Sequence, residues 1–266
     1  MPKKKGSIVF ACGPGQSTRL WQAQITRFGA DYNVLLCGLT EAGWSPRATD
    51  VTGISLDDYV TQLMAIMEKA TAERPVVVGH FIAGTALLRL AARYPDKIKA
   101  AVVVGTAGCY CKRTDYQFGV EEKTLQGLLS SIRESFTAGA RILMDLQFTE
   151  PDPTHVRTGW MSDTLNDVTR NDLLACVTLM HQIDIRSELE RIRTPTLIIA
   201  GERDSVVPIA AARVLQESIL DSQLEVISDA GQIATLTRPS AFNSALERFL
   251  RQLRLERTMW AIYYSW

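Results

Sequence analysis

The sequence offers few side chains of a reactive type. It holds three histidines and five cysteines, and none of them recur at the spacing typical of a zinc site. Cys109 and Cys111 form a Cys-x-Cys, but two thiols without further ligands indicate ordinary buried cysteines. Gly13-Pro14-Gly15 is a short turn with no lysine that could reach a phosphate. The residue types therefore predict neither a metal ion nor a cofactor.

Two side chains could serve as an acid or a base. Asp204 follows an apolar run, and burial would raise the pKa of its carboxyl group toward the range that a general base needs. His181 lies in the helical pattern Leu179–Gln182 and would be a hydrogen-bonding group or a base if it faced a pocket. His155 lies close to Pro151 and Pro153 and is expected to be exposed.

Short apolar, β-branched runs alternate with helical patterns, which is typical of a parallel sheet covered by helices on both faces. A capping pattern at Ser55–Asp58 predicts a helix to about Ala70, and a second helix is predicted over Ile82–Tyr94. Residues 121–189 predict several helices that form a cap over the carboxyl edge of the sheet, where ligands of such sheets bind. The predicted strands are Ser7–Cys12, Asn33–Cys37, Val76–Gly79, Ala100–Gly105, Thr196–Gly201 and Leu224–Ile227.

Length and charge exclude several classes of protein. The 266 residues are 46% hydrophobic and 22% charged, which is enough apolar material for a sizeable core. The 29 basic and 29 acidic side chains balance, so we expect neither nucleic acid nor a membrane as a partner. The scattered cysteines predict reduced thiols in the cytoplasm, and Ile8–Ala11 is too short an apolar stretch for a signal peptide or a membrane span.

Three segments together resemble the α/β-hydrolase superfamily. Val76–Gly84 is laid out like that family's nucleophile elbow, written G-x-S-x-G. Gly201–Pro208 resembles the family's acid loop, and Asp229–Gln232 stands where the family places its histidine. The resemblance covers about residues 7–253. It implies an α/β-hydrolase fold, with a mostly parallel, doubly wound sheet and a helical cap inserted before the last two strands.

Further motifs are most similar to the branch that contains a bacterial stress-regulatory hydrolase and the plant strigolactone and karrikin receptors. These motifs are Cys12–Ser17, Ala42–Ser45, Gly108–Tyr110 and Phe118–Glu122. The resemblance implies a core in two parts, residues 1–109 and 189–254, and a cap over residues 110–188. The aromatic tail, residues 255–266, is expected to form a strand or turn that packs on the chain's own body or across a homodimer.

The sequence departs from this family at the positions that carry hydrolysis. Phe81 stands where the family has its nucleophilic serine, and Gln232 stands where it has its histidine. Asp204 matches the acid, but the imidazole that it would orient is absent. Ile82 can supply one oxyanion N–H, whereas the second donor falls on Pro14, which has no N–H. The resemblance therefore implies a hydrolase fold without the family's covalent chemistry.

A mostly apolar pocket is expected between the sheet edge and the cap. Phe81 should form its floor beside Pro14 and Ile82, while Asp204 and Gln232 share a wall and hydrogen-bond to each other. His181 should approach from the cap. Two further residues, Cys12 and His80, could lie beside the pocket, although residues at such positions more often have a structural role.

Three functions remain open at this point. The first is a cofactor-free, non-hydrolytic enzyme, such as a cyclase, lyase or isomerase, that acts on a mostly apolar small molecule by orienting it. The second is a catalytically inactive sensor or regulatory binding protein. The third is a residual hydrolase in which Asp204 or His181 activates water. The candidate catalytic residues are thus Asp204, His181 and Gln232. An open cavity beside Phe81 would support the first two, and a cavity filled by its ring would favour a protein-interaction role.

Overall fold

The computed structural model describes residues 4–38, 54–70, 74–149 and 151–263, with side chains described as far as residue 253. Six parallel strands form one sheet in the order β2-β1-β3-β4-β5-β6. The predicted strand positions and the fold class are confirmed. The strands are β1 (Ser7–Cys12), β2 (Asn33–Cys37), β3 (Val76–His80), β4 (Ala100–Val104), β5 (Thr196–Gly201) and β6 (Ser222–Ile227).

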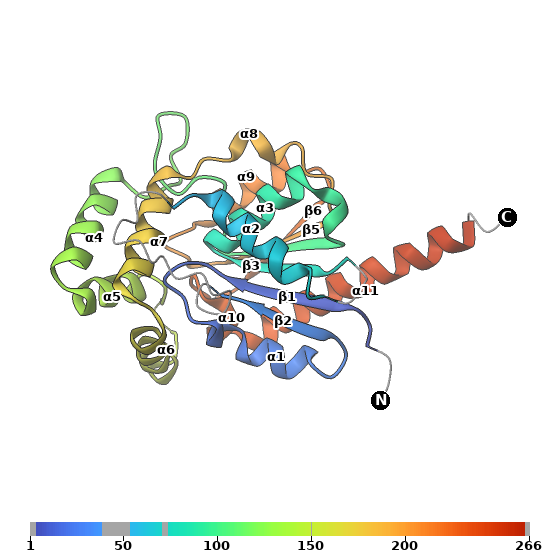
Figure 1. Ribbon diagram of the computed structural model, residues 1–266, viewed down its shortest axis with the longest axis horizontal. Coiled ribbons are helices and arrows are strands. Elements are labelled where there is room, and N and C mark those ends of the chain that lie inside the picture. Colours follow the sequence, from blue (N-terminus) through green and yellow to red (C-terminus); the bar gives the residue numbers. More distant parts are fainter. Residues whose placement is uncertain (1–3, 39–53, 71–73, 150, 264–266) are drawn as a thin grey trace.

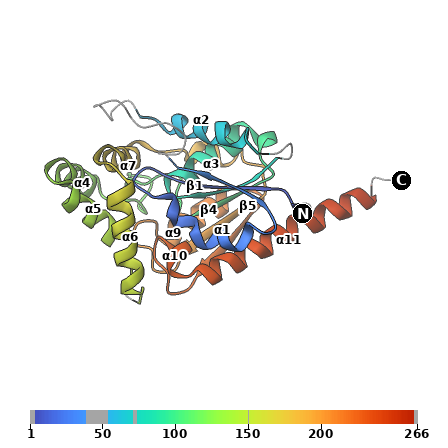
Figure 2. The same ribbon diagram turned by 60° about the horizontal axis from the view of Figure 1, so that its bottom comes forward.

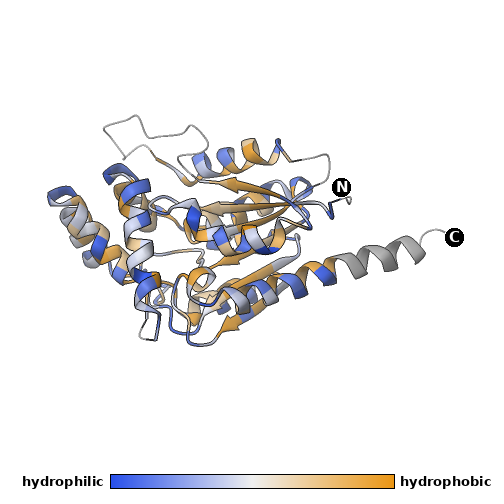
Figure 3. Cartoon of the chain, turned by 90° about the horizontal axis from the view of Figure 1, so that it is seen from below, coloured by the Kyte–Doolittle hydropathy of each residue, from blue (hydrophilic) through white to orange (hydrophobic). Residues whose placement is uncertain are grey.

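The central strands are mostly apolar because helices cover both faces of the sheet. Every residue of β1, β3, β4 and β5 is buried. Figure 2 shows α2 (Leu56–Met67) and α3 (Ile82–Arg93) on one face, and α1 (Gln22–Phe28) and α11 (Pro239–Tyr263) on the other. Figure 3 shows the apolar colour gathered in the strands and on the helix faces that meet them.

Four helices between β4 and β5 form the predicted cap. Figure 1 shows them together at one end of the sheet. They are α4 (Glu122–Glu134), α5 (Phe136–Asp145), α6 (Thr154–Asp167) and α7 (Arg170–Gln182). The remaining short helices are η1 (Thr18–Trp21), η3 (Pro95–Lys97), α8 (Arg186–Leu189), α9 (Ile209–Ser218) and α10 (Ala234–Thr237).

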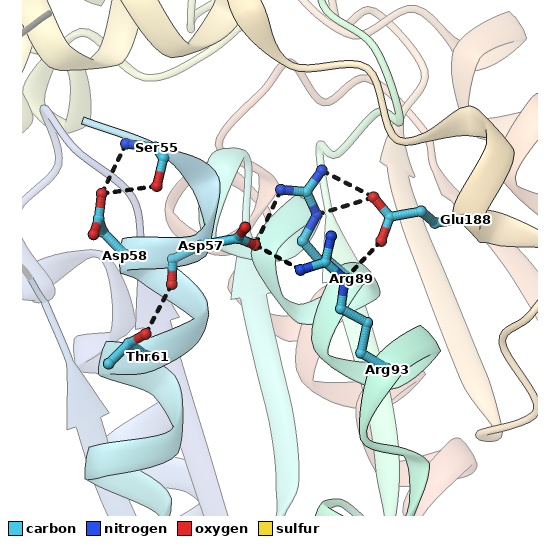
Figure 4. Close-up of polar contacts among 7 residues, drawn as sticks. All are labelled: Ser55, Asp57, Asp58, Thr61, Arg89, Arg93 and Glu188. Atoms are coloured by element: carbon cyan, nitrogen blue, oxygen red, sulfur yellow. Dashed lines mark hydrogen bonds and ion pairs between the residues drawn. The ribbon is translucent and has the colours of Figure 1, made fainter. Parts of the chain in front are cut away.

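An ion-pair network fixes the point where the chain returns from the cap to the core (Figure 4). Asp57 on α2 accepts from Arg89 and Arg93 on α3, at 3.1 and 3.0 Å. Glu188 on α8 accepts from the same two guanidinium groups at 2.9 and 3.1 Å. Ser55 and Asp58 form the predicted capping box at the start of α2. The network therefore joins α2 and α8 to α3, the helix that follows Phe81.

No helix in the described ranges combines the length and the apolar composition that crossing a bilayer requires. The motif Ala42–Ser45 lies outside the described residues. The expectation of a strand or turn in the tail is wrong as far as Tyr263, because α11 continues helically to that residue. Both ribbon views show the C-terminal part of α11 extending beyond the sheet (Figures 1 and 2).

Truncation after Leu255 tests the role of the tail. The deletion removes six large apolar side chains that soluble monomers seldom expose together, namely Met259, Trp260, Ile262, Tyr263, Tyr264 and Trp266. We expect a lower melting temperature or a change of oligomeric state, measured by thermal unfolding and by light scattering after size exclusion. A truncated protein that matches the full chain in both measurements would show that the tail has neither role.

Candidate functional site

A sharp turn joins β3 to α3, and Phe81 lies at its tip. Its backbone has φ 55° and ψ −122°, a conformation that few residues other than glycine adopt. The Phe81 N–H donates to the Val104 carbonyl at 2.9 Å, and the Thr106 hydroxyl donates to the Phe81 carbonyl at 3.2 Å. A Cβ on Gly79 would lie only 2.7 Å from Gly84 Cα, so this crossing needs glycine. The predicted elbow is present and carries a phenyl ring.

A cavity of about 460 Å³ lies between the carboxyl edge of the sheet and the cap. Its lining is mostly apolar, and the described lining includes no Asp, Glu, His, Lys or Arg. The core contributes Pro14, Gly15, Gln16, Phe81, Ser205, Val206, Pro208, Ala210 and Gln232. The cap and its connections contribute Gln117, Phe118, Gly119, Val120, Thr124, Leu128, Leu143, Met144, Leu146, Gln147, Leu173, Cys176 and Met180. The expected pocket is therefore present, with Phe81, Pro14 and Gln232 in its wall.

The Phe81 ring lines the cavity without closing it. The ring packs against Tyr110 in an edge-to-face arrangement, with 4.7 Å between the ring centroids. Tyr110 is itself buried, and its hydroxyl lies 2.7 Å from the Thr85 hydroxyl, which donates to the Ala107 carbonyl at 2.9 Å. These contacts hold the phenyl ring to one side and leave the space beside it free.

Asp204 is a buried carboxyl group with one satisfied oxygen. Its Oδ1 accepts from the backbone N–H groups of Val206 and Val207, both at 2.8 Å. Its Oδ2 has no hydrogen-bond partner among the described residues. Burial raises the pKa of this carboxyl group to about 7, against the opposing effect of the two backbone bonds. Asp204 does not belong to the cavity lining, although the next residue, Ser205, does.

Gln232 lines the cavity and is fixed by its amide nitrogen. Nε2 donates to the Gly105 carbonyl at 3.0 Å, while Oε1 has no partner among the described residues. The expected hydrogen bond from Gln232 to Asp204 is therefore wrong. The physical reason is one of position: the amide nitrogen lies against the Gly105 carbonyl at the end of β4, and neither oxygen of Asp204 is within hydrogen-bonding distance of it. Both buried oxygens, Oδ2 of Asp204 and Oε1 of Gln232, are left as acceptors.

His80 is buried and links the two glutamines of the core wall. Its Nε2 lies 3.0 Å from the backbone carbonyl of Gln232, which can only accept, so this nitrogen carries the proton. Burial lowers the pKa of His80 to about 4, which leaves Nδ1 as an acceptor for the Gln16 amide at 2.8 Å. His80 is not part of the cavity lining. It is a positioning residue for Gln16 and Gln232.

Three other expected pocket residues do not line the cavity. Ile82 is fully buried at the start of α3, and the buried thiol of Cys12 donates to the Gln16 carbonyl at 3.7 Å. His181 lies on the cap surface with its side chain 41% exposed, and its Nε2 contacts Glu122 at 3.2 Å. The helical period explains the error, because Met180 faces the cavity and the next residue is turned by about 100°.

The sequence analysis did not identify the cap residues that line the cavity. Leu173, Cys176 and Met180 recur at intervals of three and four on α7, which is the signal of one helix face. Cys176 is buried, and burial raises the pKa of its thiol to about 12, so the thiol is a neutral part of the cavity wall. Gln16 was also missed, although it stands in the same loop as Pro14.

The arrangement suits the binding of a neutral molecule. Within the described ranges, no three His, Cys, Asp or Glu side chains gather as ligands for a metal ion. Phe81 has no proton to lose and no lone pair with which to attack a carbonyl carbon. Gln232 can form hydrogen bonds but cannot act as a base near neutral pH. The wall can therefore orient a ligand by its shape and by fixed amide dipoles.

Comparison with known proteins agrees with this fold. The family model described as "Serine aminopeptidase, S33" matches residues 3–231. A curated relative, 3-oxoadipate enol-lactonase 2 from Acinetobacter baylyi, is 27% identical over 92% of this chain and 89% of its own length. A probable esterase from Oryza sativa is 25% identical over 93% of this chain and 92% of its own length. The solved structure of a bromoperoxidase from Bacillus anthracis superposes with a TM-score of 0.81 over 93% of both chains, at 24% identity. The chain belongs to the serine aminopeptidase S33 family, within the α/β-hydrolase superfamily.

Proposed function

We propose that this protein binds a neutral, mostly apolar small molecule between its sheet edge and its cap, and converts that molecule without hydrolysis and without a cofactor. The reaction would be that of a cyclase, lyase or isomerase. The observation that carries the proposal is the open cavity of about 460 Å³ beside Phe81, whose described lining has no charged side chain. A cavity of this size lies in the range of small-molecule sites.

Three residues argue against the covalent hydrolysis that the names of the relatives suggest. Phe81 offers no nucleophile, and Gln232 offers no base. Losing either group typically costs about a million-fold in rate. Pro14 lines the cavity where a backbone N–H would stabilise an oxyanion, and the loss of one such donor costs roughly a hundred- to thousandfold.

The proposed chemistry uses what the site retains. A preorganised wall can hold a flexible molecule in one reactive conformation, and such orientation alone can remove several kcal/mol of a barrier. Asp204 stands next to the cavity wall with an unpartnered Oδ2 and a pKa raised to about 7. This pKa suits proton exchange near neutral pH, and Asp204 is the sequence neighbour of Ser205, which lines the cavity. Curated relatives such as the enol-lactonase are named as enzymes, which also supports catalysis.

One observation favours a sensor as the second candidate. No side chain of the described cavity lining ionises near neutral pH, since its one titratable group is the thiol of Cys176 with a pKa raised to about 12. A protein that only recognises a neutral ligand needs no such group. A residual hydrolase is supported less well, because His181 lies on the cap surface and Asp204 does not line the cavity.

A thermal-shift screen with lipophilic metabolites, followed by product analysis, tests the proposal. A ligand at a hundredfold excess over its dissociation constant should stabilise the fold by about 2.7 kcal/mol. Phe81→Trp should abolish the shift because the larger ring fills the cavity. Tyr94→Trp, at an exposed position outside the cavity, is the matched control and should keep the shift.

The products decide between the candidates. Hits that return chemically changed support the enzyme, and hits that return intact support the sensor. An unshifted melting temperature with every ligand would overturn both functions. A shift that survives Phe81→Trp would place the binding site elsewhere.

A further inference from the structure

We infer that the ligand of this cavity is an amphiphile that binds with its apolar end against Phe81 and its single polar end at the mouth, where the lining is exposed to solvent. The inference rests on the proposed function and narrows it to a ligand class, a hydrocarbon or terpenoid skeleton with a neutral head such as a hydroxyl or a sugar. A compound with polar groups at both ends should be rejected. This orientation is the reverse of the one that hydrolysis needs, because a nucleophile at the elbow must meet the polar ester group of its substrate.

The inner end of the cavity offers a ligand no free polar side chain. The buried residues of the described lining are apolar with three exceptions, namely Gln16, Cys176 and Gln232. The Gln16 amide accepts from the Gly13 N–H at 3.2 Å and donates to Nδ1 of His80 at 2.8 Å. The Gln232 amide donates to the Gly105 carbonyl at 3.0 Å, and its Oε1 is covered by protein, out of reach of a ligand. A polar group carried to this end would therefore lose its water and find no side chain to bind.

The mouth of the cavity offers the polar groups that the inner end lacks. It is formed by the exposed residues of the described lining, namely Gln117, Phe118, Thr124, Leu146 and Ser205. Gln117 Nε2 donates to the carbonyls of Arg113 and Thr114, at 2.8 and 3.2 Å, which leaves its Oε1 as an acceptor. Ser205 Oγ donates to the Leu146 carbonyl at 3.2 Å and keeps its lone pairs as acceptors. A neutral head at the mouth thus meets hydrogen-bonding side chains and stays in contact with water.

The two ends of the cavity therefore select opposite parts of a ligand. Burial of an apolar skeleton is favourable in proportion to its area, whereas burial of a hydroxyl without a partner is unfavourable. Phe118 and Leu146, which are 41% and 40% exposed, extend the apolar surface to the mouth, so they cover the part of the skeleton next to the head. A ligand lying the other way would expose its skeleton to water and desolvate its head at Phe81.

Three alkyl compounds test the orientation in the unaltered full chain, namely decan-1-ol, decyl glucoside and 1,10-decanediol. Each is titrated by calorimetry at concentrations that form no micelles. We expect decan-1-ol and decyl glucoside to bind about equally, because the enlarged head stays in solvent. The diol should bind roughly ten- to hundredfold more weakly, because its second hydroxyl is buried without a partner. If the head pointed inward, the glucoside would be excluded, and the diol, whose outer hydroxyl would stay in water, would match decan-1-ol.

Cysteine variants locate the head of the bound ligand. Thr124→Cys places a thiol at the mouth, and Leu173→Cys places one among the buried lining residues. N-decylmaleimide carries its reactive group as the head, so it should alkylate Thr124→Cys roughly tenfold or more faster than N-ethylmaleimide, which has no tail to hold it. Gln126→Cys is the matched control, because it is exposed on the same helix outside the lining and should react with both reagents at similar rates. Leu173→Cys should show no preference for the decyl reagent.

Each outcome decides the matter. If the diol matches decan-1-ol and the glucoside does not bind, the ligand lies the other way, so the inference is wrong and the proposed function stands. Equal binding of all three compounds, or a preference of Leu173→Cys for the decyl reagent, leads to the same conclusion. If none of the three compounds binds, the proposed small-molecule function fails together with the inference. The comparison of the three compounds uses the unaltered chain, so it stays decisive even if a cysteine variant fails to fold.

Discussion

Replacing Asp204 with asparagine should stabilise the protein above pH 7, by up to about 4 kcal/mol at pH 8. The carboxyl group is buried, and its pKa is raised from 3.8 to about 7 in the folded chain. Above pH 7 the group is ionised in both the folded and the unfolded state, and the folded state bears the cost of a buried charge. A shift of about three pKa units corresponds to about 4 kcal/mol.

The stability that Asp204→Asn gains over the unaltered protein should disappear as the pH falls. Between pH 7 and pH 4 the folded state retains a proton that the unfolded state has released, so the stability of the unaltered protein rises as the pH falls through this range. Asp204→Asn keeps Oδ1 as the acceptor for Val206 and Val207 and removes the titration. Urea unfolding at pH 5 and pH 8 measures the difference. An equal stability of both proteins at pH 8 would show that the charge of Asp204 is compensated.

Titration of His80 changes the stability in the opposite direction to Asp204 over nearly the same pH range. Its pKa is lowered from 6.5 to about 4, so the unfolded state binds the proton first and stability is lost as the pH falls from 6.5 to 4. The lowered pKa of His80 corresponds to a loss of about 3 kcal/mol in stability on acidification, which nearly offsets the stability that the unaltered protein gains from Asp204. The pH profile of Asp204→Asn should therefore show the loss due to His80 clearly. Asp96→Asn, at an exposed position, is the control and should change stability by less than about 0.5 kcal/mol at either pH.

The sheet was predictable because its signals are local. β-Branched runs such as Val76–Val78 are buried on both faces of the sheet. Because parallel strands are covered on both faces, their sequences are continuous apolar runs that can be recognised without tertiary information. The elbow was predictable as well, because Gly79 and Gly84 are needed where the backbone crosses itself closely. The family's residue order placed Asp204 and Gln232 near one another at the strand ends.

The cap side of the site was not predictable from the sequence alone. Whether Met180 or His181 faces the cavity depends on the rotation of α7, which packing against α4 decides and residue types do not. The missing hydrogen bond between Gln232 and Asp204 depends equally on a tertiary contact. The Gly105 carbonyl lies within reach of Gln232 Nε2 only because β4 and the Gln232 loop end at the same edge of the sheet.

Restoring hydrolysis should require at least two substitutions. The unaltered chain and Phe81→Ser alone should not hydrolyse an aryl acetate above the rate of boiled protein, because Gln232 supplies no base. The double variant Phe81→Ser with Gln232→His should show weak turnover. The turn that carries Phe81 already has the elbow conformation, with φ 55°. Asp204 Oδ2 is also unpartnered and can accept from a histidine introduced at position 232.

The rate of the double variant should remain roughly a hundred- to thousandfold below that of a complete site, because Pro14 cannot donate to an oxyanion. Release of the aryl alcohol, followed by absorbance over a range of ester concentrations, measures the turnover. Phe81→Ala with Gln232→His is the matched control, since it opens the same space and offers no nucleophile. Turnover by that control would point to water activated by the introduced histidine. Robust turnover by Phe81→Ser alone would show that the site already holds a base, and that Gln232 is not the reason for the missing hydrolysis.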